Sequence, residues 1–372
     1  MQMTTPPRSS GERRVEIPAG LEKFRLSMRC PDCLRAFGEP IEGALRCDSC
    51  GRRFPWDFVG EGVAMSLLPT VLSPLKTKIQ SFWGDLCRQW YTSNDSKRSA
   101  TELEKELDLL TDMFRRRTHL AVTEMGEGSL AGKKILEIGS GGGAHSALFR
   151  RRGADIVALD LTPERVFSTA TKQGLLQVRH PGAGLALQGD SESLPFEDET
   201  FDIVYSNGVL HHTEDTRQAI QEAHRVLKKG GKIVLMLYSR NSALYWLKLW
   251  PAALLRGWIF HVPERYWMGW LTEGRPKFQS EPNPITSVYS AREIRSLLRD
   301  FNAVQLRKTG FTFGHFPFPW SMGVRDRLFK WFGGMAHPAG RIVYGHPYVM
   351  ETRLEKWLGQ WVGFDWNIEG LK

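Results

Sequence analysis

Four cysteines near the start of the chain have the spacing of a metal site. Cys30 and Cys33 form one C-x2-C pair, and Cys47 and Cys50 form a second one after thirteen intervening residues. Each pair lies on a short turn that directs two thiolates at one point, so two turns supply a tetrahedral set of sulfurs. The pattern predicts Zn²⁺; a rubredoxin-like iron site and four free thiols are the alternatives. Because four sulfurs leave zinc no open position for water or substrate, we expect this metal to be structural.

A glycine-rich turn offers a different chemistry, the binding of a ligand by the main chain. Residues 134–143 are KILEIGSGGG, an apolar run suited to a buried parallel strand and then a turn without obstructing side chains. Such a turn opens onto a helix N-terminus. The next apolar run, DIVALD at 155–160, ends in Asp160, where a carboxylate would meet a ribose diol. Taken alone, the turn also fits an ordinary tight loop or a dinucleotide site.

Further motifs follow between residues 131 and 240. After E-x-G-x-G-x-G and the acid Asp160 come GD-x-E-x-LPF, FD-x-V-x-S and RVLKKGG. In this order they closely resemble class I S-adenosylmethionine-dependent methyltransferases, particularly the branch that contains the quinone C-methyltransferases and many small-molecule methyltransferases. An NAD site would also place Asp160 on a ribose, but it does not predict the GD-x-E-x-LPF element.

The resemblance implies an α/β fold with a doubly wound, seven-stranded Rossmann-like sheet and a cofactor site at the strand ends. Glu137 and the glycine backbone would hold the methionine part of S-adenosylmethionine, Asp160 would accept hydrogen bonds from both ribose hydroxyls, and Leu161 would pack on the adenine. Asp190 and the Ser191 amide would bind the amino edge of the adenine. The full predicted cofactor set is Glu137, Gly139, Gly141, Gly143, Asp160, Leu161, Asp190, Ser191 and Asn207.

Two histidines follow the fourth strand in NGVLHHTED, residues 207–215. Ligands of open α/β sheets bind at the carboxyl ends of the strands, so His211 and His212 are the candidate base or substrate-orienting groups, with His211 preferred. Methyl transfer from a sulfonium is an in-line displacement that needs positioning and no catalytic metal. A base is needed where the acceptor is a hydroxyl or an acidic carbon. The alternative is that one histidine packs in the core and the other faces solvent.

Strands and helices must position these residues at one edge. Apolar runs predict strands at the start of 134–143 and at 155–160, 185–188, 201–208, 232–238, 301–311 and 363–370. Between them, Pro163 suits the first turn of a helix that Gly174 can end. Ser290 and Glu293 form a capping box that opens a later helix.

The chain of 372 residues is long enough for about two domains. We expect a flexible segment, a zinc ribbon, a helical linker with an N-terminal lid, and a methyltransferase domain, at residues 1–27, 28–70, 71–130 and 131–372. Trp90 and Tyr91 in the linker would close over the cofactor. Aromatic-rich insertions at 241–283 and 312–358 would cover the carboxyl edge of the sheet, where they would shape the acceptor pocket or form a lid with its own small core.

The net charge of +9 makes the surface attractive to anions, whether nucleic acid, an anionic membrane or an acidic small molecule. The apolar run at 243–260 is interrupted by Lys248, Pro251 and Arg256, which disfavours a spanning helix and leaves an interfacial or lid helix, with peripheral membrane contact. The start of the sequence has no secretory apolar segment, so we expect a cytoplasmic protein.

The sequence therefore predicts an S-adenosylmethionine-dependent methyltransferase that acts on a small lipophilic or aromatic acceptor, such as a secondary metabolite, a quinone or a lipid. One alternative is an rRNA or tRNA base methyltransferase that recognises RNA through its zinc ribbon, because residues 28–69 resemble the ribbons of the tRNA-methyltransferase activator family and of rRNA guanine methyltransferases. The apolar insertions and dispersed arginines disfavour RNA. A second alternative is a non-catalytic cofactor-binding protein whose ribbon docks a protein partner.

Overall fold

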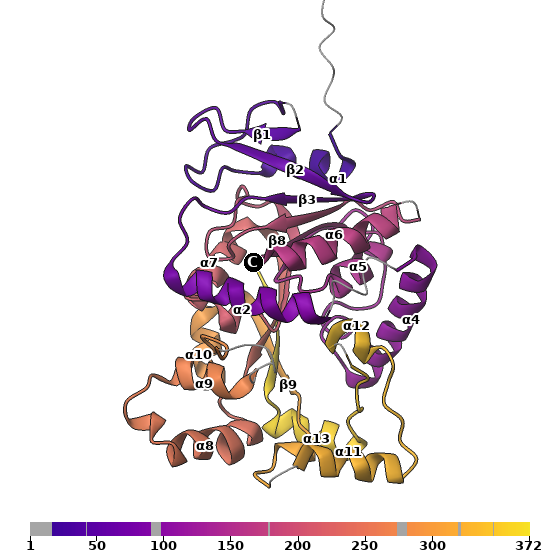
Figure 1. The fold of residues 1–372 in the computed structure, drawn as a ribbon, viewed down its shortest axis with the longest axis vertical. Helices are drawn as coiled ribbons and strands as arrows, with labels where there is room; N and C mark the ends of the chain where they lie inside the picture. The colour runs from indigo at the N-terminus through magenta and orange to yellow at the C-terminus, as the bar shows by residue number, and fades with distance from the viewer. Residues whose placement is uncertain are drawn as a thin grey trace, which may run out of the picture.

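The structure is a computed structural model that describes residues 17–41, 43–90, 98–177, 179–273, 281–318, 321–344 and 346–372. Its centre is a ten-stranded sheet with the order β1-β2-β3-β6-β5-β4-β7-β8-β10-β9 (Figure 1). The strands are β1 (Ala44–Arg46), β2 (Arg53–Val59), β3 (Gly62–Ser66), β4 (Lys134–Ile138), β5 (Asp155–Asp160), β6 (Gly184–Gln188), β7 (Phe201–Asn207), β8 (Leu227–Tyr238), β9 (Asn302–Thr309) and β10 (Asp365–Leu371).

The seven strands predicted for the catalytic domain are all present as β4 to β10, but the prediction that the sheet stops at seven is wrong. The cysteine-bearing unit adds β1, β2 and β3. β3 pairs in parallel with β6, with Ala64 opposite Ala186, and the amide of Leu67 donates to the carbonyl of Gln188 at 2.8 Å. The unit is therefore an extension of the sheet.

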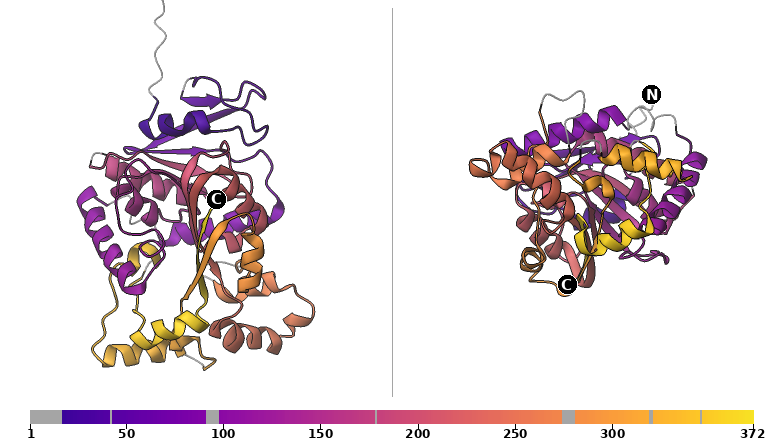
Figure 2. Two further views of the ribbon diagram at one scale, coloured as in Figure 1. Left: turned by 180° about the vertical axis from the view of Figure 1, so that it is seen from behind. Right: turned by 90° about the horizontal axis from the view of Figure 1, so that it is seen from below.

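Helices cover both faces of the sheet, as a doubly wound fold requires (Figures 1 and 2). The helices of the described residues are α1 (Ala19–Phe24), α2 (Pro74–Trp90), α4 (Ala100–Arg117), α5 (Ala144–Arg151), α6 (Pro163–Gln177), α7 (Thr216–Val226), α8 (Trp250–Leu255), α9 (Glu264–Thr272), α10 (Ala291–Leu297), α11 (Ser321–Trp331), α12 (Gly340–Tyr344) and α13 (Arg353–Val362), of which α8, α11 and α13 lie beyond the sheet at one end of the molecule. Neighbouring residues of β4 point to opposite faces, so Leu136 lies in one core and Ile135 in the other.

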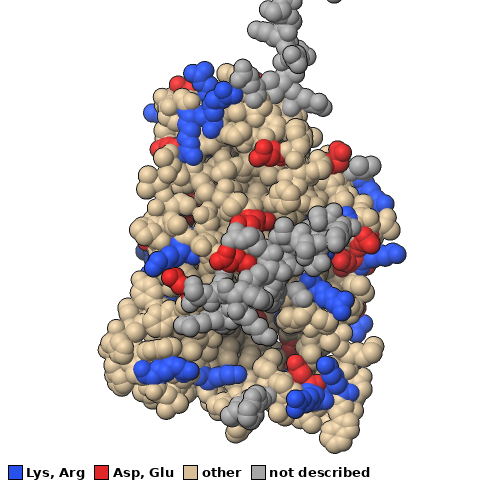
Figure 3. All heavy atoms as spheres, in the orientation of Figure 1, with Lys and Arg blue, Asp and Glu red and all other residues tan. Residues whose placement is uncertain are grey.

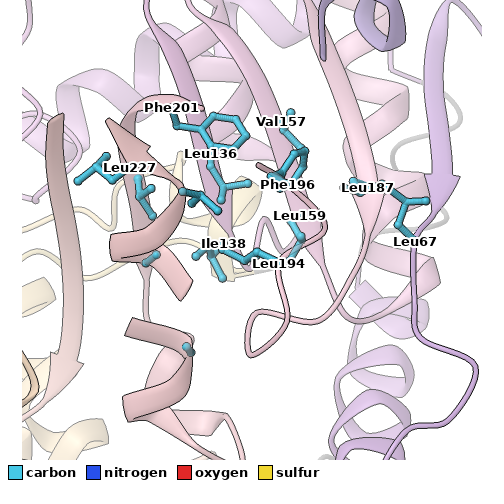
Figure 4. Close-up of a cluster of buried hydrophobic side chains, with 14 of the residues drawn as sticks. Leu67, Leu136, Ile138, Val157, Leu159, Leu187, Leu194, Phe196, Phe201 and Leu227 are labelled. Atoms are coloured by element: carbon cyan, nitrogen blue, oxygen red, sulfur yellow. The ribbon is translucent and has the colours of Figure 1, made fainter. Parts of the chain in front are cut away.

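The first core runs from the catalytic sheet into the cysteine unit without a break. Figure 4 shows Leu136, Val157 and Leu187 on the same face of the sheet, with Leu67 close to Leu187. Leu45 and other side chains of the cysteine unit belong to the same buried cluster. Continuous burial of apolar surface of this kind stabilises the unit and the catalytic sheet together.

Two local predictions need correction. The segment expected to be flexible through residue 27 contains α1, whose Leu21 and Phe24 are fully buried, and Phe24 stacks on Phe201 at 6.1 Å between ring centroids; residues 1–16 lie outside the described part. Gly174 does not end α6, which continues to Gln177. It is a glycine because a Cβ there would lie 2.4 Å from the backbone nitrogen of Gly62, where β3 crosses the helix. The capping box is confirmed: Ser290 accepts from the amide of Glu293 at the start of α10.

The two insertions meet at the end of the molecule opposite the cysteine unit (Figures 1 and 2). The first contains η3 (Tyr245–Leu249), α8, η4 (Trp258–Phe260) and α9, and the second contains η5 (Phe313–His315), α11, α12 and α13. Lys248 of the first donates to the carbonyl of Gly314 of the second at 3.4 Å. Across the described residues, no helix has both the length and the apolar character needed to cross a membrane.

Candidate functional site

A cavity of about 750 Å³ opens at the carboxyl ends of β4, β5, β6 and β7. This is the edge at which ligands bind in open α/β sheets. The loops that follow these strands contribute Gly139–Gly142, Asp160–Thr162, Gly189–Glu192 and Asn207–Val209 to its lining. Of the residues predicted to hold the cofactor, Glu137 and Gly143 do not line the cavity.

The turn after β4 requires glycine at three positions, both for its backbone angles and for the space around each residue. Gly139, Gly141 and Gly143 all have positive φ angles, of 77°, 55° and 78°, which other residues adopt only with strain. A Cβ on Gly139 would lie 2.2 Å from Cγ2 of Val209, and one on Gly143 would lie 2.7 Å from Cα of Thr169. A Cβ on Gly141 would meet only the Arg165 guanidinium, at 3.5 Å, so this residue exposes its backbone to the cavity.

The carboxylate of Asp160 is held at the cavity wall by the main chain. Its Oδ2 accepts from the amide of Gly141 at 3.0 Å, and its Oδ1 accepts from the amide of Thr162 at 3.0 Å. The next carbonyl, that of Leu161, accepts from Nε2 of Gln80 in α2 at 2.9 Å. The ends of β4 and β5 are thus fixed to one another and to α2.

Asp190 lies in an ion pair that was not predicted. Nζ of Lys76 lies 2.6 Å from Oδ2 of Asp190 and 2.9 Å from Oε2 of Glu192. Burial lowers the pKa of Lys76, but the hydrogen bonds and charges of the two carboxylates outweigh it, and the pKa is raised above its ordinary value. Lys76 therefore stays charged in the cavity wall.

Lys76 belongs to one face of α2 that closes a side of the cavity. This face is formed by Lys76, Ile79, Trp83 and Leu86, at the spacing of successive helical turns. The Arg165 guanidinium lies over the Trp83 ring at 4.8 Å. Tyr91 and the side chain of Trp90, from which a lid was expected, lie outside the described part of the chain. The helical spacing of the apolar residues of α2 could have predicted which face of this helix lines the cavity.

The two histidines have different positions. His212 lines the cavity, and its Nδ1 lies 3.1 Å from the carbonyl oxygen of Ile285, 3.2 Å from Nδ2 of Asn283 and 3.1 Å from Oγ1 of Thr286. Nε2 lies 3.6 Å from Oε1 of Glu273, a residue of the first insertion that sequence reasoning missed. Burial lowers the pKa of His212, although the Glu273 charge opposes this shift.

His211 lies behind His212, outside the cavity lining. It is fully buried, and its ring packs on the Tyr238 ring with centroids 3.8 Å apart. Burial and then the neighbouring His212 charge lower its pKa well below the ordinary value. His211 is therefore neutral and packed beneath the group that faces the cavity.

Glu137 also lies behind the cavity, next to a histidine that lines it. Burial raises the pKa of Glu137 well above its ordinary value. Nδ1 of His145 lies 3.8 Å from Oε1 of Glu137 and 3.1 Å from the Tyr205 hydroxyl. Glu137 does not line the cavity, so it would act on a bound ligand indirectly, through neighbouring residues such as His145.

The four cysteines of the ribbon converge as predicted. Their sulfur atoms all lie within 4.8 Å of one another, with Cys30 to Cys50 at 3.6 Å and Cys33 to Cys47 at 3.4 Å. Tetrahedral zinc with Zn–S bonds of about 2.3 Å requires sulfurs about 3.8 Å apart, so the four side chains fit a zinc ion. The cysteine cluster is thus compatible with a zinc ribbon.

Comparisons with known proteins identify the part of the chain around the cavity. Residues 136–235 match the family model of the methyltransferase domain. The uncharacterized methyltransferase YcgJ of Bacillus subtilis is 36% identical over 106 residues, which cover 28% of this chain and 40% of that protein. The demethylmenaquinone methyltransferase of Renibacterium salmoninarum is 32% identical over 172 residues, covering 45% of this chain and 62% of that protein. The chain thus spans less than two thirds of the length of these relatives.

Among solved structures, a complex between the Haloferax volcanii Trm112 methyltransferase activator and the putative methyltransferase contains a similar chain. The identity is 16%, and the match covers 73% of this chain and 95% of that one, with a TM-score of 0.40. The family model and the sequence relatives together show that residues 136–235, which supply most of the cavity lining, form a methyltransferase domain.

Proposed function

We propose that the protein transfers a methyl group from S-adenosylmethionine to a small, lipophilic or aromatic acceptor. The observation that carries the proposal is the composition of one cavity. Its lining combines the polar groups of Gly141, Asp160 and Asp190 with apolar groups of α2 and α12 and with His212. A cavity of this size and mixed lining is typical of small-molecule sites.

The residues that line the cavity would have different roles in the proposed reaction. Asp160 would hold the ribose hydroxyls and the Gly141 backbone would hold the methionine part. Asp190, with the Ser191 amide, would bind the adenine. S-adenosylmethionine, when bound, supplies an electrophilic methyl group whose transfer leaves a neutral thioether. Ile79 and other apolar side chains would exclude water and orient the acceptor.

We propose His212 as the base where the acceptor carries an acidic proton. In the tautomer in which Nδ1 donates to the Ile285 carbonyl, Nε2 is unprotonated and can accept that proton. Proton uptake would create an imidazolium 3.6 Å from the Glu273 carboxylate, which stabilises that charge. The Tyr238 hydroxyl donates to the same carboxylate at 2.9 Å and holds it in place.

The ribbon is proposed to bind one structural zinc ion through Cys30, Cys33, Cys47 and Cys50. Thiolate ligation of this kind suits the reducing cytoplasm, in which we place the protein. We propose a structural role for this zinc ion because the ribbon is small. A unit of its size buries too little apolar surface to fold without a metal or a neighbouring domain.

Labelled methyl transfer tests the activity directly. Full-length protein is incubated with methyl-labelled S-adenosylmethionine and organic-phase or aqueous fractions of a cell extract. We expect label in a low-molecular-weight organic-phase product, and none with Asp160→Ala. Label found only in the RNA fraction would support the RNA alternative, and cofactor binding by calorimetry without any transfer would support the non-catalytic one.

A further inference from the structure

The two insertions expose an unusual amount of apolar surface at one end of the molecule. We define the apolar end as the described residues of Tyr245–Phe260, Ser321–Met335 and Arg353–Val362. Large side chains that it exposes include Trp246, Phe260, Trp331, Phe332, Trp357 and Trp361, of which Trp331 and Phe332 are 80% and 85% exposed. Soluble monomers rarely gather such residues into one patch without a partner for it.

The exposed residues belong to helical faces that point away from the protein. In α13, Leu354, Trp357 and Trp361 follow one another at helical spacing and are all more than half exposed, whereas Glu355 and Gly359 on the opposite side are buried. α8, α11 and α13 all lie at this end of the molecule (Figure 1). A hollow of about 520 Å³ between η5, α11 and α13 is lined mainly by phenylalanine and aliphatic side chains.

The charges at this end all favour an anionic partner. Its exposed ionic residues are cations, namely Arg256, Arg327, Lys330, Arg353 and Lys356. Asp326 and Glu355 are its acids among the described residues, and both pair with Arg325, at 3.2 and 2.8 Å. Figure 3 shows Lys and Arg side chains, with some Asp and Glu side chains beside them, in the lower part of one face.

We propose that the apolar end docks on the surface of an anionic phospholipid bilayer. Tryptophans beside arginines and lysines on amphipathic helices are the composition that enters the headgroup region, where rings bury and cations meet lipid charge. A second copy of the chain fits less well, because a twofold contact through this end would bring its cations against one another. The same insertions supply Glu273 and Tyr344 to the cavity wall, so docking would bring the cavity near acceptors dissolved in the bilayer; this last step rests on the proposed function.

Vesicle co-sedimentation of the full chain tests the docking without any acceptor. We expect binding to vesicles that contain about one third phosphatidylglycerol, weaker binding to phosphatidylcholine alone, and a decrease with added salt. Trp357→Ser with Trp361→Ser should weaken binding to both vesicles at least about tenfold. Arg353→Gln with Lys356→Gln should weaken binding to the anionic vesicles alone, by about tenfold or more.

Matched variants at the opposite end serve as controls. Phe58→Ser removes an aromatic ring that is 63% exposed in β2, and Arg35→Gln with Arg46→Gln removes two exposed cations there; both should bind vesicles like the original protein. The proposal is overturned if the original protein sediments with neither vesicle, or if the tryptophan variant binds equally well. It is also overturned if light scattering shows a dimer that the tryptophan variant dissociates while vesicles do not bind.

Two further measurements separate this proposal from the proposed function. Calorimetry with S-adenosylmethionine and methyl transfer to detergent-dispersed extract should be unchanged in the tryptophan variant, because its substitutions lie outside the cavity. Docking that is lost with transfer intact confirms the surface. Transfer that is absent while vesicle binding persists removes the proposed activity and leaves the docking in place.

Discussion

The Nζ atom of Lys76 lies 2.6 Å from Oδ2 of Asp190, so the helix α2 is tied to the carboxylate proposed to bind the adenine. The two residues are 114 positions apart in the chain. Lys76 also reaches Glu192 at 2.9 Å. One lysine thus pairs with two carboxylates in the wall of the cavity and leaves one net negative charge there.

Lys76→Met should destabilise the protein by about 1–3 kcal/mol, because it leaves two poorly solvated carboxylates without their cation. S-adenosylmethionine carries a net positive charge and an amino group that Asp190 would accept from. The rise in melting temperature on adding it should therefore be larger in this variant than in the original protein. Thermal melts with and without the cofactor check this. Lys78→Met, on the exposed side of the same helix, should change neither quantity.

His212→Gln should lower kcat by about 10²–10⁴-fold if His212 removes a proton from the acceptor. The affinity for S-adenosylmethionine, measured by calorimetry, should change less than about twofold, since the proposed cofactor contacts lie elsewhere. A loss of cofactor affinity equal to the loss of kcat would mean that the histidine only maintains the shape of the cavity.

The pH dependence of kcat is a second test of His212 as the base. The pKa of His212 is lowered from its ordinary value of 6.5 by burial. A base must be unprotonated, so the rate should stay level as pH falls to 6.5 and decline only below it. An acidic limb that begins clearly above pH 6.5 would contradict the assignment. In His212→Gln this limb should disappear.

Gly141→Ala should reduce the affinity for S-adenosylmethionine by at least about tenfold, because the added methyl would enter the cavity beside the backbone that holds the methionine part. Gly126→Ala is the matched control: its φ is also positive, at 67°, and nothing lies within 4 Å of the added Cβ. Both variants should lose about 1 kcal/mol of stability through backbone strain. Equal cofactor affinities in the two variants would argue against the proposed position of the cofactor.

Cys47→Ser should abolish zinc binding, whereas Cys87→Ser, at a buried cysteine outside the cluster, should leave it intact. Metal analysis of purified protein checks the stoichiometry, which we expect to be about one zinc per chain in the original protein. Because β3 pairs with β6, loss of the metal should lower the melting temperature of the catalytic sheet as well. Zinc bound equally by both variants would remove the predicted site.

The strands β4 to β10 could be predicted from the sequence, most clearly where a short apolar run has a turn behind it, as at 134–143 and 155–160. The pairing of β3 with β6 could not, since neither strand carries a local mark of its partner. The same reason hid Lys76 and Glu273, which reach the cavity from segments far along the chain. Gly174 shows a different kind of wrong prediction. A glycine often marks the end of a helix, but this one is required by the close approach of β3.

The pairing of β3 with β6 also protects the protein against aggregation. β6 would be the outer strand of the catalytic sheet, and its unpaired amides and carbonyls would offer a template to any other extended chain. The ribbon covers that edge and ends in the very short β1. If the ribbon holds the proposed zinc ion, a chain without the metal would lose this cover, and we expect aggregation of the protein, more than slow turnover, when zinc is scarce.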